Sequence, residues 1–365
     1  MASLKDNLQR KAASETLHSV QIYRASAVLL VVLFHGSAFI LSRYKVAPLE
    51  NMFQTGFSGV FLFFVISGFI ILTAHHRDLG RPDRLSYYLS RRLIRIYPFF
   101  WVVLIIWGGW RIFTGDIGMA ELASNALVFK GAPQLIIPVS WTLRYEIVFY
   151  ALFVAAILDK RLGWLVFLGW FGLQWGYAPP ALRGLTDPMN LLFMMGLGAA
   201  IGCFRLQTCS DATRDRLGWL FLMLGLTGFV VTMMVYGQLE VDTNAWPGHP
   251  VAIFGFGISS ALLLLASVSG AINRRMGQWR LIALIGNASY AIYLTHSPFG
   301  KLAWNLLRPI KPLWQEPPEP WVANLILVWV AVASVLAGIL VHLKIEQPLL
   351  AALRGRLANP AARAE

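Results

Sequence analysis

The stretch VQIYRASAVLLVVLFHGSAFILS, residues 20–42, is apolar enough to lie in lipid, yet it contains Arg24 and His35. It is also long enough to cross a bilayer, because a helix needs about 20 apolar residues to span about 30 Å of hydrocarbon. A charged side chain in the middle of such a helix costs about 3 kcal/mol or more, so it marks a candidate functional residue. The stretch therefore predicts a transmembrane helix with two candidate functional side chains.

The rest of the chain has the same character. Of its 365 residues, 57% are hydrophobic and 13% are charged, and the mean hydropathy is +0.60. A soluble domain is usually about 25% charged. We therefore expect an all-α, polytopic integral membrane protein with about ten transmembrane helices and no additional soluble domain. The candidate spans are 22–41, 53–74, 97–114, 140–158, 163–178, 188–204, 217–236, 250–269, 281–303 and 321–343.

The formal net charge of +13 follows from the loops between these spans. With the N-terminus in the cytoplasm, 21 of the 31 Lys and Arg residues fall in cytoplasmic segments, and 8 fall in outer segments or at the outer ends of spans. Positively charged residues accumulate on the cytoplasmic side of membrane proteins. The basic residues are thus topology signals that face anionic lipid. We expect no nucleic-acid partner, and both termini are predicted to be cytoplasmic.

Arg24 and His35 are 11 residues apart in the first predicted span. At 100° and 1.5 Å per residue, both project from one face of a helix and are about 16 Å apart along its axis. The same rise places His35 about 20 Å from the cytoplasmic edge. Two ordinary explanations stay open: Arg24 reaches the interface by snorkelling, and His35 is a structural histidine.

Two further polar residues are predicted at a depth similar to that of His35. Glu146 lies in SWTLRYEIVFY and His296 lies in SYAIYLTHSPF. A carboxylate beside a histidine fixes its tautomer, so His35 and Glu146 are candidates for proton transfer. The alternatives are an ion pair between Glu146 and Arg144 and a core hydrogen bond at His296.

The second predicted span contains a pair of small residues, Ser67 and Gly68, within GVFLFFVISGFII. Small residues in a bulky apolar run allow the close approach of another helix or of a ligand. Both interpretations, helix packing and ligand binding, stay open.

A dense basic cluster, Arg91, Arg92 and Arg95, follows the second span. Arginine forks are suited to phosphate groups, so the cluster is a candidate phosphate site. The alternative is simple anchoring on the cytoplasmic side. Tyr97 and Pro98 are expected to begin the third span, because proline is tolerated in the first turn of a helix.

The order of these motifs resembles that of the bacterial membrane acyltransferase family 3, and within it the polysaccharide O-acetyltransferases. The stretches that carry the likeness are YRASAVLLVVLFH with its Arg-x10-His pattern, GVFLFFVISGFII, RRLIRIYP, SWTLRYEIVFY and LIGNASYAIYLTHSPF, and the closing KIEQPL fits as well. The resemblance implies transfer of an acyl group, usually acetyl, from acyl-CoA to a hydroxyl of a glycan. It implies a transmembrane acyltransferase domain at 22–348, between cytoplasmic tails at 1–21 and 349–365.

The resemblance also assigns roles to single residues. His35 is similar to the family's catalytic histidine, Arg24 to its motif partner and Glu146 to the acidic residue of the motif that contains WTL. We expect the substrate to contact Trp141, Tyr290 and His296, and we expect no metal. The residues expected to bind the donor are Arg91, Arg92, Arg95, Ser67 and Gly68.

The expected donor is cytoplasmic acyl-CoA, used as a substrate, with no tightly bound cofactor. The expected acceptor is a glycan or a lipid-linked saccharide. The other expected partners are membrane lipid and a polysaccharide-biosynthesis complex in the bacterial inner membrane. Two other classes of function stay open: a transporter or flippase for a polysaccharide precursor, and a structural component of an export complex.

A reporter fused after Glu365 tests the predicted topology. An even number of spans returns the C-terminus to the cytoplasm, so we expect fluorescence from a GFP fusion and no activity from an alkaline phosphatase fusion at this position. Phosphatase activity there would require an odd number of spans.

Overall fold

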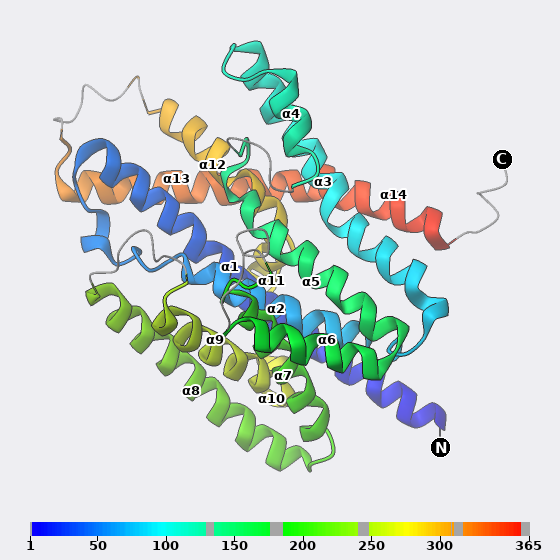
Figure 1. Cartoon of the computed structure of the whole chain (residues 1–365). Helices are drawn as coiled ribbons and strands as arrows, with labels where there is room; N and C mark the ends of the chain where they lie inside the picture. Colours follow the sequence, from blue (N-terminus) through cyan, green and yellow to red (C-terminus); the bar gives the residue numbers. More distant parts are fainter. Residues whose placement is uncertain are drawn as a thin grey trace. The chain divides into compact units, whose positions relative to one another are not determined.

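The computed structural model describes residues 2–128, 135–175, 185–239, 248–307, 309 and 317–358, and the side chains of those from 18 to 355. Every regular element in these ranges is helical, which confirms the predicted all-α fold (Figure 1). Helices suit lipid because they satisfy their backbone N–H and C=O groups within one segment.

The α-helices differ widely in length, from 7 residues in α4 to 43 in α1. The α-helices are α1 (Ala2–Tyr44), α2 (Ser58–His75), α3 (Leu85–Phe113), α4 (Met119–Asn125), α5 (Trp141–Leu158), α6 (Lys160–Leu173), α7 (Asn190–Leu206), α8 (Asp211–Gln238), α9 (Pro250–Leu265), α10 (Gly270–Met276), α11 (Arg280–Asn287), α12 (Ser289–Asn305), α13 (Pro320–Val341) and α14 (Gln347–Ala358). Short 3-10 turns lie at Pro48–Asn51, Pro82–Arg84, Pro138–Ser140 and Ala266–Val268, and a π-helical turn at His342–Glu346 joins α13 to α14.

Seven helices in the described residues are long and apolar enough to cross a membrane. They are His18–Tyr44, Ser58–His75, Pro82–Phe113, Pro138–Leu158, Asp211–Gln238, Pro250–Val268 and Pro320–Gly355. The other three predicted spans coincide with shorter elements: α6 with 14 residues, α7 with 17, and the pair α11 and α12 with 8 and 17. At 1.5 Å per residue, α6 covers only about 21 Å. The predicted span 163–178 also continues into residues 176–178, which lie outside the described residues.

Two helix boundaries differ from the predictions. α3 begins at Leu85, so Pro98 lies inside the helix and not in its first turn. Membrane helices tolerate internal proline because neighbouring groups satisfy the freed backbone carbonyl. The predicted span 281–303 is divided at Ala288 into α11 and α12. Asn and Ser flank this position, and both residue types favour helix ends over helix interiors.

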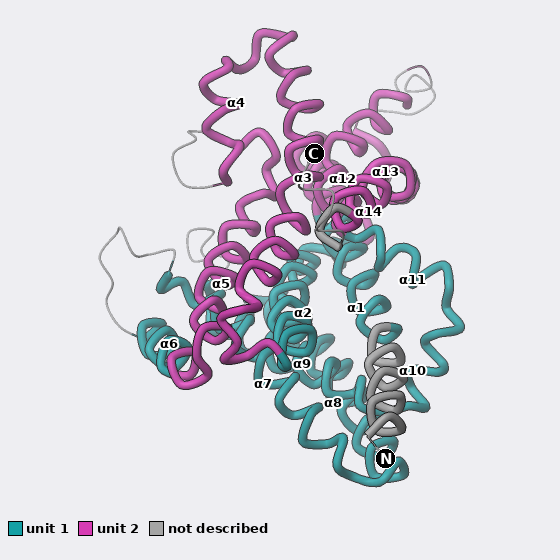
Figure 2. The backbone as a smooth tube through the Cα atoms, turned by 90° about the vertical axis from the view of Figure 1, so that its right-hand side faces the viewer, with its two compact units in different colours: residues 1–34, 50–77, 165–289 teal, residues 35–49, 78–164, 290–365 magenta. Residues whose placement is uncertain are grey.

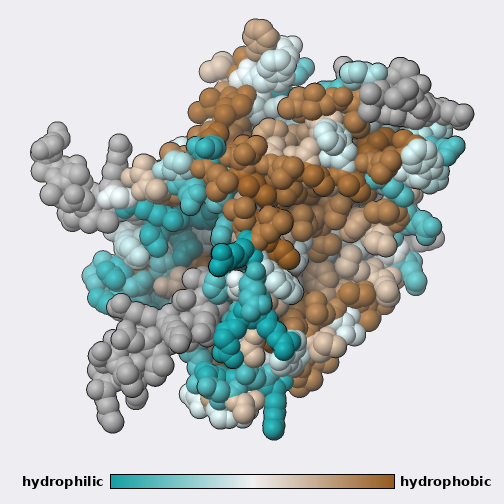
Figure 3. Space-filling model, turned by 180° about the vertical axis from the view of Figure 1, so that it is seen from behind, coloured by the Kyte–Doolittle hydropathy of each residue, from teal (hydrophilic) through white to brown (hydrophobic). Residues whose placement is uncertain are grey.

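Large apolar side chains remain exposed on several of the long helices. Figure 3 shows hydrophobic residues gathered over a large part of one face. The exposed fraction is 63% for Ile105 on α3, 64% for Met234 on α8 and 59% for Leu340 on α13. Soluble proteins rarely expose large apolar patches. These faces are therefore expected to contact lipid, in agreement with the membrane character predicted from the composition.

The chain forms two compact units, which Figure 2 draws in different colours. Both are assembled from segments that are distant in the sequence, and α1 and α6 contribute residues to each of them. Unit 1 comprises residues 1–34, 50–77 and 165–289, and unit 2 comprises residues 35–49, 78–164 and 290–365.

In unit 1, α2 packs against α7 and α9, and α9 also packs against α8. Two glycines bring the backbones of α2 and α7 into contact. A Cβ atom on Gly68 would lie 2.1 Å from the carbonyl oxygen of Phe193, and one on Gly196 would lie 2.0 Å from that of Val65. Membrane helices often associate through such small residues. The contact agrees with the packing interpretation of Gly68.

In unit 2, α3 packs against α4, α5 and α14. Buried hydroxyl groups connect the apolar helices. Tyr88 on α3 donates a hydrogen bond of 2.9 Å to the carbonyl oxygen of Tyr150 on α5. The hydroxyl of Tyr293 on α12 lies 3.0 Å from Oγ1 of Thr142 and donates to the carbonyl oxygen of Val139 at 3.2 Å. These bonds position α12, which carries His296, against the start of α5.

Replacing Gly196 by alanine tests the contact between α2 and α7. The added methyl group would collide with backbone, and overpacking of this kind costs about 1–3 kcal/mol. We expect Gly196→Ala to lower the melting temperature of the detergent-solubilised protein. Gly198 on the same helix is the matched control, because a Cβ there meets nothing within 4 Å. Equal melting temperatures for Gly196→Ala and Gly198→Ala would contradict the packing.

Candidate functional site

His35 on α1 and His296 on α12 lie against each other in unit 2. Their ring centroids are 5.1 Å apart, and the ring planes are inclined by 37°. His296 is buried, with 3% of its surface exposed. The sequence pointed to each histidine separately, and the structure brings them together. Two imidazoles in contact can supply a proton acceptor and a proton donor at one place.

A backbone carbonyl determines the tautomer of His296. Its Nδ1 lies 2.7 Å from the carbonyl oxygen of Tyr293. Because a carbonyl oxygen only accepts, Nδ1 carries the hydrogen and Nε2 of the neutral ring is an acceptor. Oγ of Ser297 lies 3.3 Å from this Nε2. The core hydrogen bond considered for His296 is therefore present at one ring nitrogen, and the other nitrogen keeps its lone pair.

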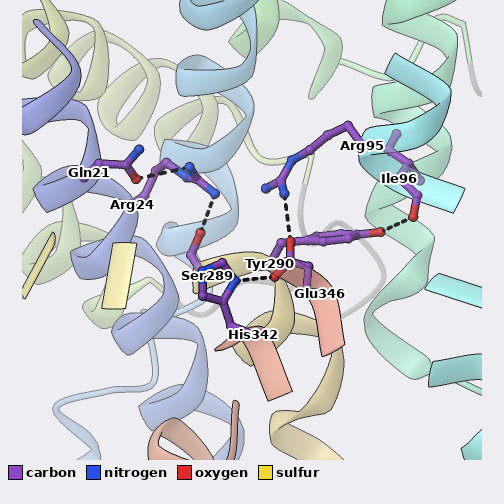
Figure 4. Close-up of polar contacts among 8 residues, drawn as sticks. All are labelled: Gln21, Arg24, Arg95, Ile96, Ser289, Tyr290, His342 and Glu346. Atoms are coloured by element: carbon purple, nitrogen blue, oxygen red, sulfur yellow. Dashed lines mark hydrogen bonds and ion pairs between the residues drawn. The ribbon is translucent and has the colours of Figure 1, made fainter. Parts of the chain in front are cut away.

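Arg24 is held by polar partners in unit 1. Its Nη1 donates to Oε1 of Gln21 at 3.1 Å, and its Nη2 donates to Oγ of Ser289 at 2.9 Å (Figure 4). If Arg24 only reached toward the interface by snorkelling, it would not need the hydrogen bond to Ser289, which is distant in the sequence. α1 is one continuous helix through Arg24 and His35, so the predicted spacing of 11 residues on one helix face is retained.

Arg95 forms a buried ion pair in unit 2. Its Nη1 lies 2.9 Å from Oε1 of Glu346, whose side chain is fully buried, while 28% of the Arg95 side chain is exposed. Oε2 of Glu346 lies 2.7 Å from Nδ1 of His342, one turn earlier (Figure 4). The pair joins α3 to the π-helical turn between α13 and α14. Such turns are rare and often lie at functional sites.

Tyr290 packs beneath the guanidinium of Arg95. The Cζ atom of Arg95 is 4.8 Å from the ring centroid, a cation–π distance. The hydroxyl of Tyr290 donates to the carbonyl oxygen of Ile96 at 2.9 Å. Tyr290 therefore connects α12 to α3, and the contact with substrate that we predicted for it stays a prediction.

Glu146 and Arg92 meet at Tyr150. The hydroxyl of Tyr150 donates to Glu146, and the guanidinium of Arg92 lies 5.6 Å from the centroid of the same ring. Glu146 also interacts electrostatically with Arg95. The described hydrogen bond of Arg144 is to the carbonyl oxygen of Val128, at 2.9 Å, rather than to Glu146. The carboxylate thus belongs with the arginine cluster.

The remaining predicted residues lie in ordinary helical surroundings. Arg91 is exposed, with its guanidinium 5.5 Å from the ring centroid of Tyr87. Trp141 begins α5 and contacts Tyr145 edge to face, with centroids 5.8 Å apart. Ser67 is partly exposed on α2. Their roles in donor or substrate binding stay predictions.

Three residues of this network were not predicted from the sequence: Glu346, His342 and Ser297. Glu346 lies in KIEQPL, which carried part of the family resemblance but received no role. An acidic residue directly after a long apolar run was the available signal, because such a residue needs a partner. No signal in the sequence pointed to Ser297, which is one of many serines in the chain.

Comparisons with known proteins show the family to which the chain belongs. A family profile described as an acyltransferase domain matches residues 17–343. The chain is also 27% identical over 263 residues to the exopolysaccharide production protein ExoZ of Rhizobium meliloti (strain 1021), which covers 67% of this chain and 77% of that protein. No solved structure matches the chain.

Breaking the Arg95–Glu346 pair tests its contribution to stability. Arg95→Leu removes the guanidinium from a buried carboxylate and leaves it with His342, so we expect the free energy of unfolding to fall by up to about 3–5 kcal/mol. The double variant Arg95→Leu/Glu346→Leu should regain most of this stability, because an apolar pair can replace a buried ion pair at little cost. The measurement is thermal unfolding in detergent, with Arg91→Leu as the control at an exposed position. Equal losses in the single and double variants would contradict the buried pair.

Proposed function

Because the chain belongs to the acyltransferase family whose profile it matches, we propose that it is an integral membrane O-acyltransferase. It moves an acyl group, acetyl in the simplest case, from cytoplasmic acyl-CoA to a hydroxyl of an exopolysaccharide or another cell-surface glycan. The similarity to an exopolysaccharide production protein supports this acceptor class. The excess of Lys and Arg in alternate loops supports a location in the bacterial inner membrane with both termini in the cytoplasm.

The observation that carries the proposal is the contact between His35 and His296. In the proposed reaction, His35 takes the proton of an acceptor hydroxyl while the oxygen attacks the thioester carbonyl of the donor. The carbon–sulfur bond breaks, an ester forms, and the CoA thiolate leaves and takes up a proton. His296, whose tautomer Tyr293 determines, orients His35 or shares its proton. A positioned base of this kind typically contributes a factor of about 10²–10⁴ to the rate.

The arginine cluster is proposed to bind the donor. Arg91 and Arg92 present guanidinium groups suited to the phosphates of CoA. Arg95 already shares the buried carboxylate of Glu346, so we assign it mainly to positioning α3 and Tyr290. Arg24 lies 11 residues before His35 on the same helix face, on the predicted cytoplasmic side, and is proposed to act as the motif partner of that histidine.

A transporter or flippase is the second candidate, since polar groups in membrane helices also line substrate paths. A transporter would need no acyl donor. It would also tolerate the loss of a base better than the loss of a cation. The contact between two histidines, one of which has a defined acceptor nitrogen, favours an enzyme that transfers protons over a transporter that moves a substrate through the membrane.

Substitution of His35 tests the proposal. We expect His35→Ala and His35→Gln to lower acylation by about 100-fold or more, because glutamine keeps polarity but cannot take the proton. The measurement is the ester content of surface glycan in a deletion strain complemented with each variant, with protein levels checked by immunoblot. His76→Gln is the matched control at an exposed histidine. Near-normal acylation by His35→Gln would exclude His35 as the base.

A further inference from the structure

A cavity of about 570 Å³ lies in unit 2. Its volume falls within the range of about 300–1,000 Å³ that is typical of ligand sites. The end of α3, the segment 135–139 and one face of α12 form its walls. The lining residues with aromatic or polar side chains are Trp107, Trp110, Arg111, Asp116, Ser297 and Lys301.

Ser297 connects this cavity to the histidine pair. Its side chain lines the cavity, and its Oγ lies 3.3 Å from Nε2 of His296. Leu294, Ser297 and Lys301 follow one another at helical spacing, so one face of α12 forms this wall. A hydroxyl group bound beside Ser297 would thus be one side chain away from His296, the partner of the proposed base.

Two tryptophans make one wall flat and apolar. Trp107 and Trp110 are three residues apart on α3 and share a helix face. Trp110 is 57% exposed. Aromatic faces carry partial negative charge, and the C–H faces of sugar rings pack against them. Tryptophan is also common at the membrane interface without a ligand, so the aromatic wall by itself does not identify the occupant.

The charged side chains that line the cavity indicate the charge of its ligand. Among the described residues, the charged side chains of the lining are Arg111, Lys301 and one carboxylate, that of Asp116. Asp116 accepts a hydrogen bond of 2.8 Å from Oγ1 of Thr114. Within the part of the chain that the structure describes, neither cation forms an ion pair. Two cations beside one carboxylate leave a net positive charge, which favours an anionic ligand over a neutral one.

We propose that this cavity binds the acceptor, and that the acceptor is a saccharide carrying an acidic group such as a carboxylate. Trp110 packs on a sugar ring, Arg111 and Lys301 bind the acidic group, and Asp116 accepts a hydrogen bond from a sugar hydroxyl. The assignment rests on the proposed acyl transfer, because the saccharide hydroxyl beside Ser297 is the one that receives the acyl group.

Binding to a matched pair of disaccharides tests the proposal. The probes are cellobiouronic acid and cellobiose, which differ by one carboxylate, measured by calorimetry with purified protein in phosphatidylcholine nanodiscs and without acyl-CoA. A charge-assisted hydrogen bond contributes about 1.5–3 kcal/mol, so we expect the acidic probe to bind at least about 10-fold tighter. Arg111→Gln/Lys301→Gln should remove this preference, and Trp110→Leu should weaken binding of both probes.

Two matched controls share the chemistry of these changes outside the cavity. Lys45→Gln removes an exposed cation, and Trp321→Leu removes a tryptophan that is 61% exposed. Both should bind the two probes like the unaltered protein. Equal affinity for the two probes, no binding of either, or unchanged binding in the cavity variants would each overturn the proposal.

The two proposals can fail separately. If the protein binds cellobiouronic acid as expected but transfers no acyl group from acetyl-CoA to any glycan, the acyl-transfer proposal fails while the saccharide site stands. If the protein transfers acyl groups while Arg111→Gln/Lys301→Gln keeps the normal KM for the acceptor, only the cavity assignment is wrong.

Discussion

A charged side chain among apolar helices needs a partner of opposite charge. Arg95 and Glu346 form such an ion pair, with Nη1 of Arg95 2.9 Å from Oε1 of Glu346. The carboxylate is fully buried and is shared with His342. Several other features of unit 2 depend on this pair. It joins α3 to the end of α13, and it holds the guanidinium over Tyr290. Tyr290 in turn donates to the backbone of α3 and begins the segment of α12 that carries His296. The ion pair and Tyr290 thus connect α3 both to the turn after α13 and to the helix that carries His296.

The buried histidines of unit 2 need hydrogen-bond partners as well. Burial of an imidazole without a hydrogen bond is costly, and His296 finds its partner in the carbonyl oxygen of Tyr293, within its own helix. This local bond leaves Nε2 available for Ser297. Glu146 accepts a hydrogen bond from Tyr150, beside the arginines. Unit 2 thus contains an imidazole pair and a group of arginines with their carboxylates and aromatic rings.

The imidazole pair and the group of arginines suit a reaction between two different substrates. Phosphate groups need fixed cations, whereas a hydroxyl nucleophile needs a neutral acceptor. The cavity between α3 and α12 supplies a third environment, with tryptophan faces and a small excess of positive charge next to Ser297. An acyltransferase requires a donor site, a base and an acceptor site, and the residues proposed here for these three roles are different ones.

The sequence alone determined the helical fold, the membrane character and a set of candidate polar residues, because apolar runs of spanning length and charges within them are local properties. It could not determine which of these polar residues meet. Glu346 received no predicted role, although it forms an ion pair with Arg95, from which it is 251 positions away in the sequence. Glu146 was predicted at the depth of His35, and the structure shows that it accepts a hydrogen bond from Tyr150. His35 and His296 were found separately, and their contact follows from the packing of α1 and α12. Helix periodicity specifies which face a residue occupies but not which helix that face will contact, so only the tertiary structure decided the pairs.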